Sequence, residues 1–306
     1  MGAREEAAAA GCRHGGAALS QFAHFAAIDW SGAVGPRQRG IAVAICSLGS
    51  AAPELVRPGH IWSRQEAVDW LLEEMPTGTL VGLDIGPSLP FPDRGAFFPG
   101  WGESPPDARR LWRLVETICA GDRHLAASSF VDHPEASRHF RRHGGRCGDL
   151  FQPGRGRLRV TEVAQQEQGL NPYSNFNLVG AAQVGKSSLT GMRLLHRIDG
   201  KLPIWPFDPL PASGSVVVEI YTSIAALAAG LPKGRTKIRD PVTLDGALAA
   251  LGSDPHAPLA AYDDHSTDAI MASAWLRRVH ADPALWAPPK LTPVLANTEG
   301  WTFGVR

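Results

Sequence analysis

Four acidic side chains stand at positions where a charge is costly unless it does chemistry. Apolar runs typical of buried strands end at Asp29, Asp84 and Glu219. A fourth acid, Asp268, lies near the start of an apolar helix. A carboxylate in such a setting must be paired, hydrogen-bonded or bound to a metal. Carboxylate oxygens suit Mg²⁺ or Mn²⁺, and two such ions can activate water and stabilise the leaving oxygen of a phosphodiester. The four acids therefore predict a divalent-metal site with phosphoryl-transfer chemistry.

Asp264 is a further candidate ligand, because it lies four residues before Asp268 and shares its helix face. Negative charge is favourable near a helix N-terminus. Each acid also has a structural interpretation as a helix cap or a turn at a strand end, and Asp264 taken alone suits an N-cap better than a ligand. The repetition of apolar runs that end in acids favours one shared site.

The elements that position these acids follow from apolar periodicity. Residues 25–29 and 41–46 are strand-like and are joined by a long Gly/Pro-rich loop, which predicts a hairpin. Ser63 and Glu66 have the spacing of a capping box and open a helix with one apolar face. A buried strand follows at residues 80–84. Strands, then a helix, then a buried strand indicate an α/β fold with a mixed sheet covered by helices.

The remainder of the chain divides into three parts. Residues 1–20 are expected to form a disordered N-terminal extension, so that the folded domain spans 21–306. Residues 86–214 are rich in proline and glycine, contain a predicted helix at 106–119, and are too long for a connection, which predicts an inserted lobe. Beyond it we expect strands at 215–220 and 300–305, a weaker strand earlier at 54–59, and helices at 223–229, 244–251 and 265–279.

Composition excludes several classes of protein. The 306 residues carry 30 basic and 30 acidic side chains, so no global field drives the chain onto a polyanion. The four cysteines lie far apart without a C-x-x-C pair, which favours a reducing compartment. No apolar run reaches the roughly 18 residues of a membrane span, and the first residues do not resemble a signal peptide. We expect a cytoplasmic protein without a membrane partner.

Local basic clusters predict contacts with nucleic acid. Seven arginines lie between Arg138 and Arg159, and four cations alternate from Lys233 to Arg239. Both clusters suit a phosphate backbone, and both also suit a solvated surface. The expected substrate contacts are Ser31, in the turn after Asp29, together with Lys186, Arg155, Arg157 and Lys237.

Two further motifs have competing interpretations. Residues 180–187, GAAQVGKS, match the phosphate-loop pattern G-x-x-x-x-G-K-[ST], but only a broken apolar stretch precedes them where a phosphate loop follows a buried strand. A turn into a helix is the simpler interpretation. The spacing of His139, His143 and Cys147 suits soft metal ligands on a helix, but two glycines interrupt it and a fourth ligand is not evident.

The ordered segments IDWSGA, GLDIGPSLP, VVVEIY, DDHSTDAIMASAWL and EGWTFGV resemble the bacterial domain-of-unknown-function family 429, described as predicted nucleases with a ribonuclease-H-like fold. The resemblance covers about residues 24–306 and implies that the family's acids fall on Asp29, Asp84, Glu219 and Asp268. The order of acids is also similar to that of Holliday-junction resolvases. Thr222 departs from the family pattern, which favours proline there. The implied nuclease function is an argument from analogy.

The sequence thus predicts a Mg²⁺- or Mn²⁺-dependent hydrolase, a nuclease or phosphodiesterase that uses two metal ions. Asp29, Glu219 and Asp268 would be primary ligands and Asp84 a shared one. An actin- or sugar-kinase-like ATP-dependent phosphotransferase is an alternative, because the turn after Asp29 contains Ser31 and Gly32. A non-catalytic metal- or nucleotide-binding module is a third.

Overall fold

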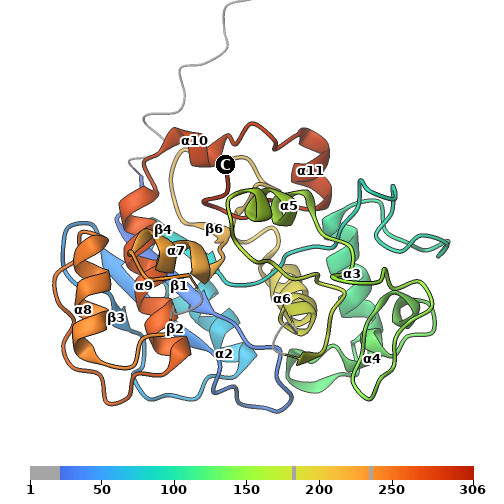
Figure 1. The fold of residues 1–306 in the computed structure, drawn as a ribbon, viewed down its shortest axis with the longest axis horizontal. Helices are drawn as coiled ribbons and strands as arrows, with labels where there is room; N and C mark the ends of the chain where they lie inside the picture. The colour runs from blue at the N-terminus through green and yellow to red at the C-terminus, as the bar shows by residue number, and fades with distance from the viewer. Residues whose placement is uncertain (1–20, 181–183, 234–236) are drawn as a thin grey trace, which may run out of the picture.

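A six-stranded mixed sheet forms the centre of the molecule, in the order β3-β2-β1-β4-β6-β5 (Figure 1). The computed structural model describes residues 21–180, 184–233 and 237–306. The predicted hairpin is confirmed: β1 (His24–Asp29) pairs antiparallel with β2 (Ala42–Ser47). β1 pairs parallel with β4 (Thr79–Leu83), and the remaining strands are β3 (Glu54–Leu55), β5 (Ile204–Trp205) and β6 (Val216–Glu219). The predicted fold class, with antiparallel first strands followed by parallel ones, is confirmed.

Helices cover both faces of the sheet, which explains why its strands are continuous apolar runs. Ala26 and Ile28 of β1 face a core that includes α3 (Ala108–Ile118) and α6 (Val184–Ile198). Phe25 and Ala27 face the opposite core, which includes α7 (Thr222–Ala228), α8 (Pro241–Ala250) and α9 (Asp264–Val279). Successive side chains therefore serve two separate cores, because strand residues alternate between faces.

The capping box that opens α2 (Arg64–Asp69) is also confirmed. The Ser63 hydroxyl accepts from the Glu66 amide at 3.1 Å, and the Glu66 carboxylate accepts from the Ser63 amide at 2.6 Å. The helix continues as a π-turn over Trp70–Glu74, which buries Trp70 and Leu71 against the sheet. The chain leaves the helix at Met75, whose backbone is extended.

Residues 86–214 supply much of one helical layer. Their helices α3 and α6 share a core with β1 and β4, and β5 extends the sheet at its edge. In Figure 1 this segment lies on the side of the molecule away from α8. Its shorter elements are η2 (Arg123–Leu125), α4 (Ser128–Val131), η3 (Ala136–His139) and α5 (Val160–Glu167). The division into a domain and an inserted lobe stays a prediction, and the extension predicted for residues 1–20 lies outside the described residues.

The C-terminal segment departs from the prediction. After α10 (Pro283–Trp286) and α11 (Pro293–Thr298), residues 300–305 form a turn with a single bridge from Thr302 to Glu219, and the predicted strand is wrong. Gly300 and Gly304 have φ values of 70° and 96°, which bend the backbone out of the extended region. The strand predicted at 54–59 ends early for a related reason, since Arg57 has φ 53°. Within the described ranges no helix has the length and apolarity that a bilayer span requires.

Candidate functional site

Asp29 and Asp84 lie side by side at the carboxyl ends of β1 and β4. The Asp84 amide donates to the carbonyl of Ile28 at 3.0 Å, which extends the parallel pairing by one residue. The two carboxyl groups hydrogen-bond to each other, and Asp84 also accepts from the Thr222 hydroxyl at 3.3 Å. Burial raises the pKa of Asp29, and burial together with the negative charges of Asp29 and Asp268 raises the pKa of Asp84 well above its usual range. Interacting buried carboxyl groups oppose each other's ionisation.

Asp268 brings a third carboxyl group to this point from α9, which crosses the same face of the sheet. Its side chain is 15% exposed. Burial raises the pKa of Asp268 to about 7; Lys237 opposes the shift and the charge of Asp29 adds to it. We call Asp29, Asp84 and Asp268 the acid cluster. Its members come from two adjacent strands and a helix, as the sequence predicted for these three residues.

Cationic side chains border the acid cluster. His265 Nδ1 lies 2.5 Å from Asp29 Oδ2, and this contact raises the pKa of His265. Lys237 Nζ lies 3.0 Å from the Asp264 carboxylate and 3.6 Å from that of Asp268. Partial burial works against it, but these carboxylates raise the pKa of Lys237. Asp264 is also paired with Arg239, so it lies at the cationic rim of the cluster.

The acid cluster contains oxygen donors, but the described side chains do not form a metal site. Across residues 21–180, 184–233 and 237–306, no three Asp, Glu, His or Cys side chains are arranged to hold a metal ion. The buried carboxyl groups nevertheless offer hard oxygen donors of the kind Mg²⁺ and Mn²⁺ bind. Their positive partners in the structure are His265 on Asp29 and Lys237 beside Asp268. A bound cation would take the place of these contacts.

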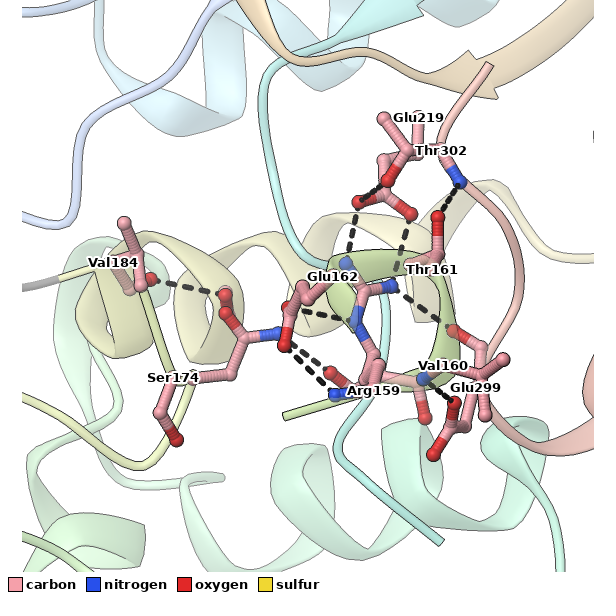
Figure 2. A network of polar contacts seen from close by, with 12 residues as sticks. Arg159, Val160, Thr161, Glu162, Ser174, Val184, Glu219, Glu299 and Thr302 are labelled. Atoms are coloured by element: carbon pink, nitrogen blue, oxygen red, sulfur yellow. Dashed lines mark hydrogen bonds and ion pairs between the residues drawn. The ribbon is translucent and has the colours of Figure 1, made fainter. Parts of the chain in front are cut away.

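Glu219 points to the other face of the sheet from Asp29. In the pairing of β4 with β6, Glu219 lies opposite Leu83, the residue that precedes Asp84. Leu83 faces the core that contains α6, and Glu219 points to the same face. Its carboxylate accepts two bonds from Arg159, at 2.5 and 2.9 Å, and one from the Thr302 hydroxyl at 2.8 Å (Figure 2). The side chain of Glu219 is 6% exposed. An arginine therefore neutralises Glu219, whereas the positive partners of the acid cluster among the described residues are His265 and Lys237.

The residues around Glu219 form a buried polar network that sequence reasoning missed. Arg159 is 2% exposed and also donates to the Glu162 carboxylate at 3.0 Å and to the Glu299 carbonyl at 3.0 Å (Figure 2). The Glu299 carboxylate accepts from the amides of Val160 and Phe91, and burial raises the pKa of Glu299 to about 7. The R-x-x-E spacing of Arg159 and Glu162 was the available signal. Contacts with Glu219 and Glu299 bridge 60 and 140 residues, beyond any local pattern.

Several arginines of the 138–159 segment are held by acids rather than free for a ligand. Arg157 is 6% exposed and binds the Asp93 carboxylate and backbone carbonyls. Other pairs join Arg138 to Asp149, and Arg142 and Arg146 to Asp132. Arg155 is exposed. Arg235, in the second cluster, lies outside the described residues.

The predicted contacts Ser31 and Lys186 lie in the turn after β1 and in the first turn of α6. A β-carbon on Gly32 would lie 2.4 Å from backbone atoms of Lys186 and Ser187, so the turn and the helix are packed without room for a methyl group. Lys186 Nζ lies 2.8 Å from His143 Nε2, and the Ser31 hydroxyl accepts from the Ala33 amide.

The surroundings of residues 180–187 differ from those of a phosphate loop. In the described stretch 171–180 the chain forms one bridge, from Asn177 to Arg141, and no strand leads into α6. Residues 181–183 of the motif lie outside the described residues. Two of the candidate soft metal ligands also differ in exposure: His139 is buried against Phe98, whereas Cys147 is exposed.

Comparisons with protein-family models, with curated proteins and with solved structures find no match to this chain. The architecture itself is a mixed α/β fold whose six-stranded sheet begins with antiparallel strands and continues with parallel ones. The resemblance to family 429 stays a prediction.

Proposed function

We propose that the acid cluster is the active centre of a metal-dependent phosphodiesterase that hydrolyses nucleic acid. The observation that carries this proposal is the convergence of Asp29, Asp84 and Asp268 at one end of the sheet, with the pKa of each raised by burial. Buried carboxyl groups that repel one another retain protons unless a cation replaces them. Perturbed titration of this kind concentrates at functional sites.

Asp29, Asp84 and Asp268 would hold Mg²⁺ or Mn²⁺ in this proposal. Such an ion, when bound, polarises a phosphoryl oxygen and lowers the pKa of a bound water. Glu219, which the sequence suggested as a primary ligand, is assigned to the Arg159 network instead. Asp264 is assigned an outer position, because Lys237 and Arg239 already pair with it.

The cations at the rim have distinct roles. His265 contacts Asp29 and is 45% exposed, so its ring can orient a water at the edge of the cluster. Lys237 is 53% exposed, and once released from Asp268 it can pair with a phosphate oxygen of the substrate.

Topology gives independent support by analogy. The order β3-β2-β1-β4-β6-β5, with β2 antiparallel to β1, is compatible with the ribonuclease-H-like arrangement that the sequence motifs imply. The kinase-like alternative requires phosphate in the turn after Asp29. The close packing of Gly32 on α6 leaves little room for a phosphate there, which disfavours the kinase-like alternative.

The test is hydrolysis of single-stranded, duplex and branched oligonucleotides with Mg²⁺ or Mn²⁺, and of ATP as the alternative substrate. We expect oligonucleotide cleavage by the wild type and a loss of at least about 100-fold in Asp29→Asn and Asp84→Asn, the scale of removing one electrostatic catalytic contact. Asp254→Asn is the matched control, because Asp254 is an exposed acid whose hydrogen bonds run to Ser50, away from the acid cluster. Equal rates in wild type and Asp29→Asn, or no cleavage under any condition, refute the proposal.

A further inference from the structure

A cavity of about 150 Å³ lies beside the acid cluster and shares Asp84 with it. Its walls come from the ends of β4 and β6, from α5 and α6, and from residues 172–175. Its polar and aromatic lining includes Trp30, Glu162, Gln165, Tyr173, Glu219 and Tyr221. A group bound here would lie directly next to the proposed point of phosphodiester cleavage.

The volume limits what the cavity can hold. An engineered protein cavity of about 150 Å³ takes up one benzene ring. One six-membered ring therefore matches this volume, and a fused purine or a base pair exceeds it. The occupant must also leave any duplex, because a stacked and paired base cannot enter a pocket.

The polar lining has more free acceptors than donors. Glu162 accepts one bond at each carboxylate oxygen, both from Arg159, and Glu219 accepts three bonds in total. Since a carboxylate has about four acceptor positions, both retain unused capacity (Figure 2). The Gln165 amide already donates to Thr302 at 2.9 Å. Including Asp84, three acids face one arginine in this wall. The lining therefore favours a ligand that donates hydrogen bonds.

Aromatic rings complete the cavity. Trp30 is 6% exposed and its indole nitrogen is fixed by a 3.0 Å bond to Thr190. Tyr173 is 39% exposed, with its hydroxyl held by Asn171 at 3.2 Å. Its exposure places it at the entrance, with Tyr221 also in the wall. Nucleobases released from a stack bind on aromatic side chains of this kind.

We infer that this cavity binds one unpaired, amino-bearing pyrimidine base of the cytosine type, next to the scissile phosphate. The ring stacks at Tyr173, and the exocyclic amino group donates to Glu162 or Glu219, since a carboxylate accepts from the cytosine amino group. The inference rests on the proposed function for its substrate class. A cavity that binds such a base makes the protein selective for single-stranded, pyrimidine-rich nucleic acid.

Binding and cleavage test the inference separately. Binding of fluorescent dC₁₀, dT₁₀ and dA₁₀, and of a fully paired duplex, is measured by anisotropy at fixed salt with EDTA. Cleavage of the same oligonucleotides is measured with Mn²⁺. The variants are Tyr173→Ala, Tyr173→Phe and Glu162→Gln, with Val163→Ala as control, since Val163 is exposed on the same helix and does not line the cavity. Tyr173 is exposed, so Tyr173→Ala tests the inference even where Glu162→Gln disturbs folding.

We expect dC₁₀ to bind more tightly than dT₁₀, dA₁₀ or duplex. Tyr173→Ala should weaken dC₁₀ binding by roughly 5- to 150-fold, the weight of one base–aromatic stack, while Tyr173→Phe and Val163→Ala keep it within about 2-fold. Cleavage of all oligonucleotides at equal rates, unaffected by Tyr173→Ala, overturns the inference and leaves the nuclease proposal intact. Selective dC₁₀ binding that depends on Tyr173 without any cleavage upholds the pocket and defeats the proposed hydrolysis. Absence of oligonucleotide binding also overturns the inference.

Discussion

The carboxyl groups of Asp29 and Asp84 hydrogen-bond across the ends of two neighbouring parallel strands. The backbone bond from Asp84 to Ile28 holds the two residues next to each other at the strand ends. With Asp268 beside them, the fold holds these groups in a state that favours protons or a metal cation. The consequences for stability can be measured without knowledge of the substrate.

Neutralising one member of the acid cluster should stabilise the fold at neutral pH. The pKa of Asp84 is raised on folding, so the folded chain binds more protons than the unfolded one, and stability falls as pH rises from about 4 through the raised value. Asp84→Asn removes this penalty, and we expect a gain on the order of 1–2 kcal/mol at pH 8 and none near pH 4. Thermal unfolding across this range measures it. A variant less stable than wild type at pH 8 would contradict the argument.

A divalent cation should stabilise the wild type more at pH 8 than at pH 5. The pKa of Asp268 is about 7, so protons compete with the cation at the lower pH. At 100 times its dissociation constant, Mn²⁺ adds about 2.7 kcal/mol. Differential scanning fluorimetry with Mn²⁺ or Mg²⁺ measures the shift in Tm.

Variants assign that shift to the acid cluster. Asp29→Asn should abolish it, whereas Glu219→Gln should retain it from a lower starting Tm, because Glu219 faces Arg159 on the other side of the sheet. An equal shift in wild type and Asp29→Asn would place the cation elsewhere.

Breaking the Arg159 network should be strongly destabilising. Arg159→Met leaves the buried carboxylates of Glu162 and Glu219 without their cation, a change that costs about 3–5 kcal/mol. Urea unfolding of Arg159→Met beside Arg155→Met makes the comparison, since Arg155 is exposed and should cost less than about 0.5 kcal/mol. Similar losses in both variants would argue against the network.

The packing of Gly32 against α6 gives a steric prediction. Gly32→Ala places a methyl group against the Lys186 backbone and should cost about 1–3 kcal/mol. Gly246→Ala is the matched control: Gly246 lies in α8 with open space around its β-carbon, and alanine there should stabilise by roughly 0.5–1 kcal/mol. Equal effects in chemical denaturation would mean that α6 yields to the added group.

Local patterns predicted the parts of the fold that depend on local forces. The hairpin of β1 and β2 and the capping box at Ser63 follow from alternation, apolar runs and cap spacing, and the structure has both. The convergence of Asp29, Asp84 and Asp268 followed from strand ends and helix position.

The role of Glu219 was beyond such patterns. An apolar run ending in an acid looks the same in β4 and β6, yet Asp84 follows the last paired residue of β4 whereas Glu219 is itself paired with Leu83. That difference of one residue turns a side chain to the other face of a sheet. The register of a strand depends on its partner strand. The cation that pairs with Glu219 is Arg159, which lies 60 residues earlier in the chain. The apolar run before Glu219 predicts neither the register nor the partner.

The position of α9 also determines when during synthesis the acid cluster can exist. Asp29 and its partner His265 are 236 residues apart, and α9 packs on β1 and β2 from the late part of the chain. A ribosome adds about 5–20 residues per second, so His265 is synthesised on the order of 10–50 s after Asp29. During that interval the nascent hairpin presents an uncovered apolar face that needs protection from aggregation. The growing polypeptide also lacks Asp268 throughout, so any activity of the cluster is withheld until α9 has left the ribosome.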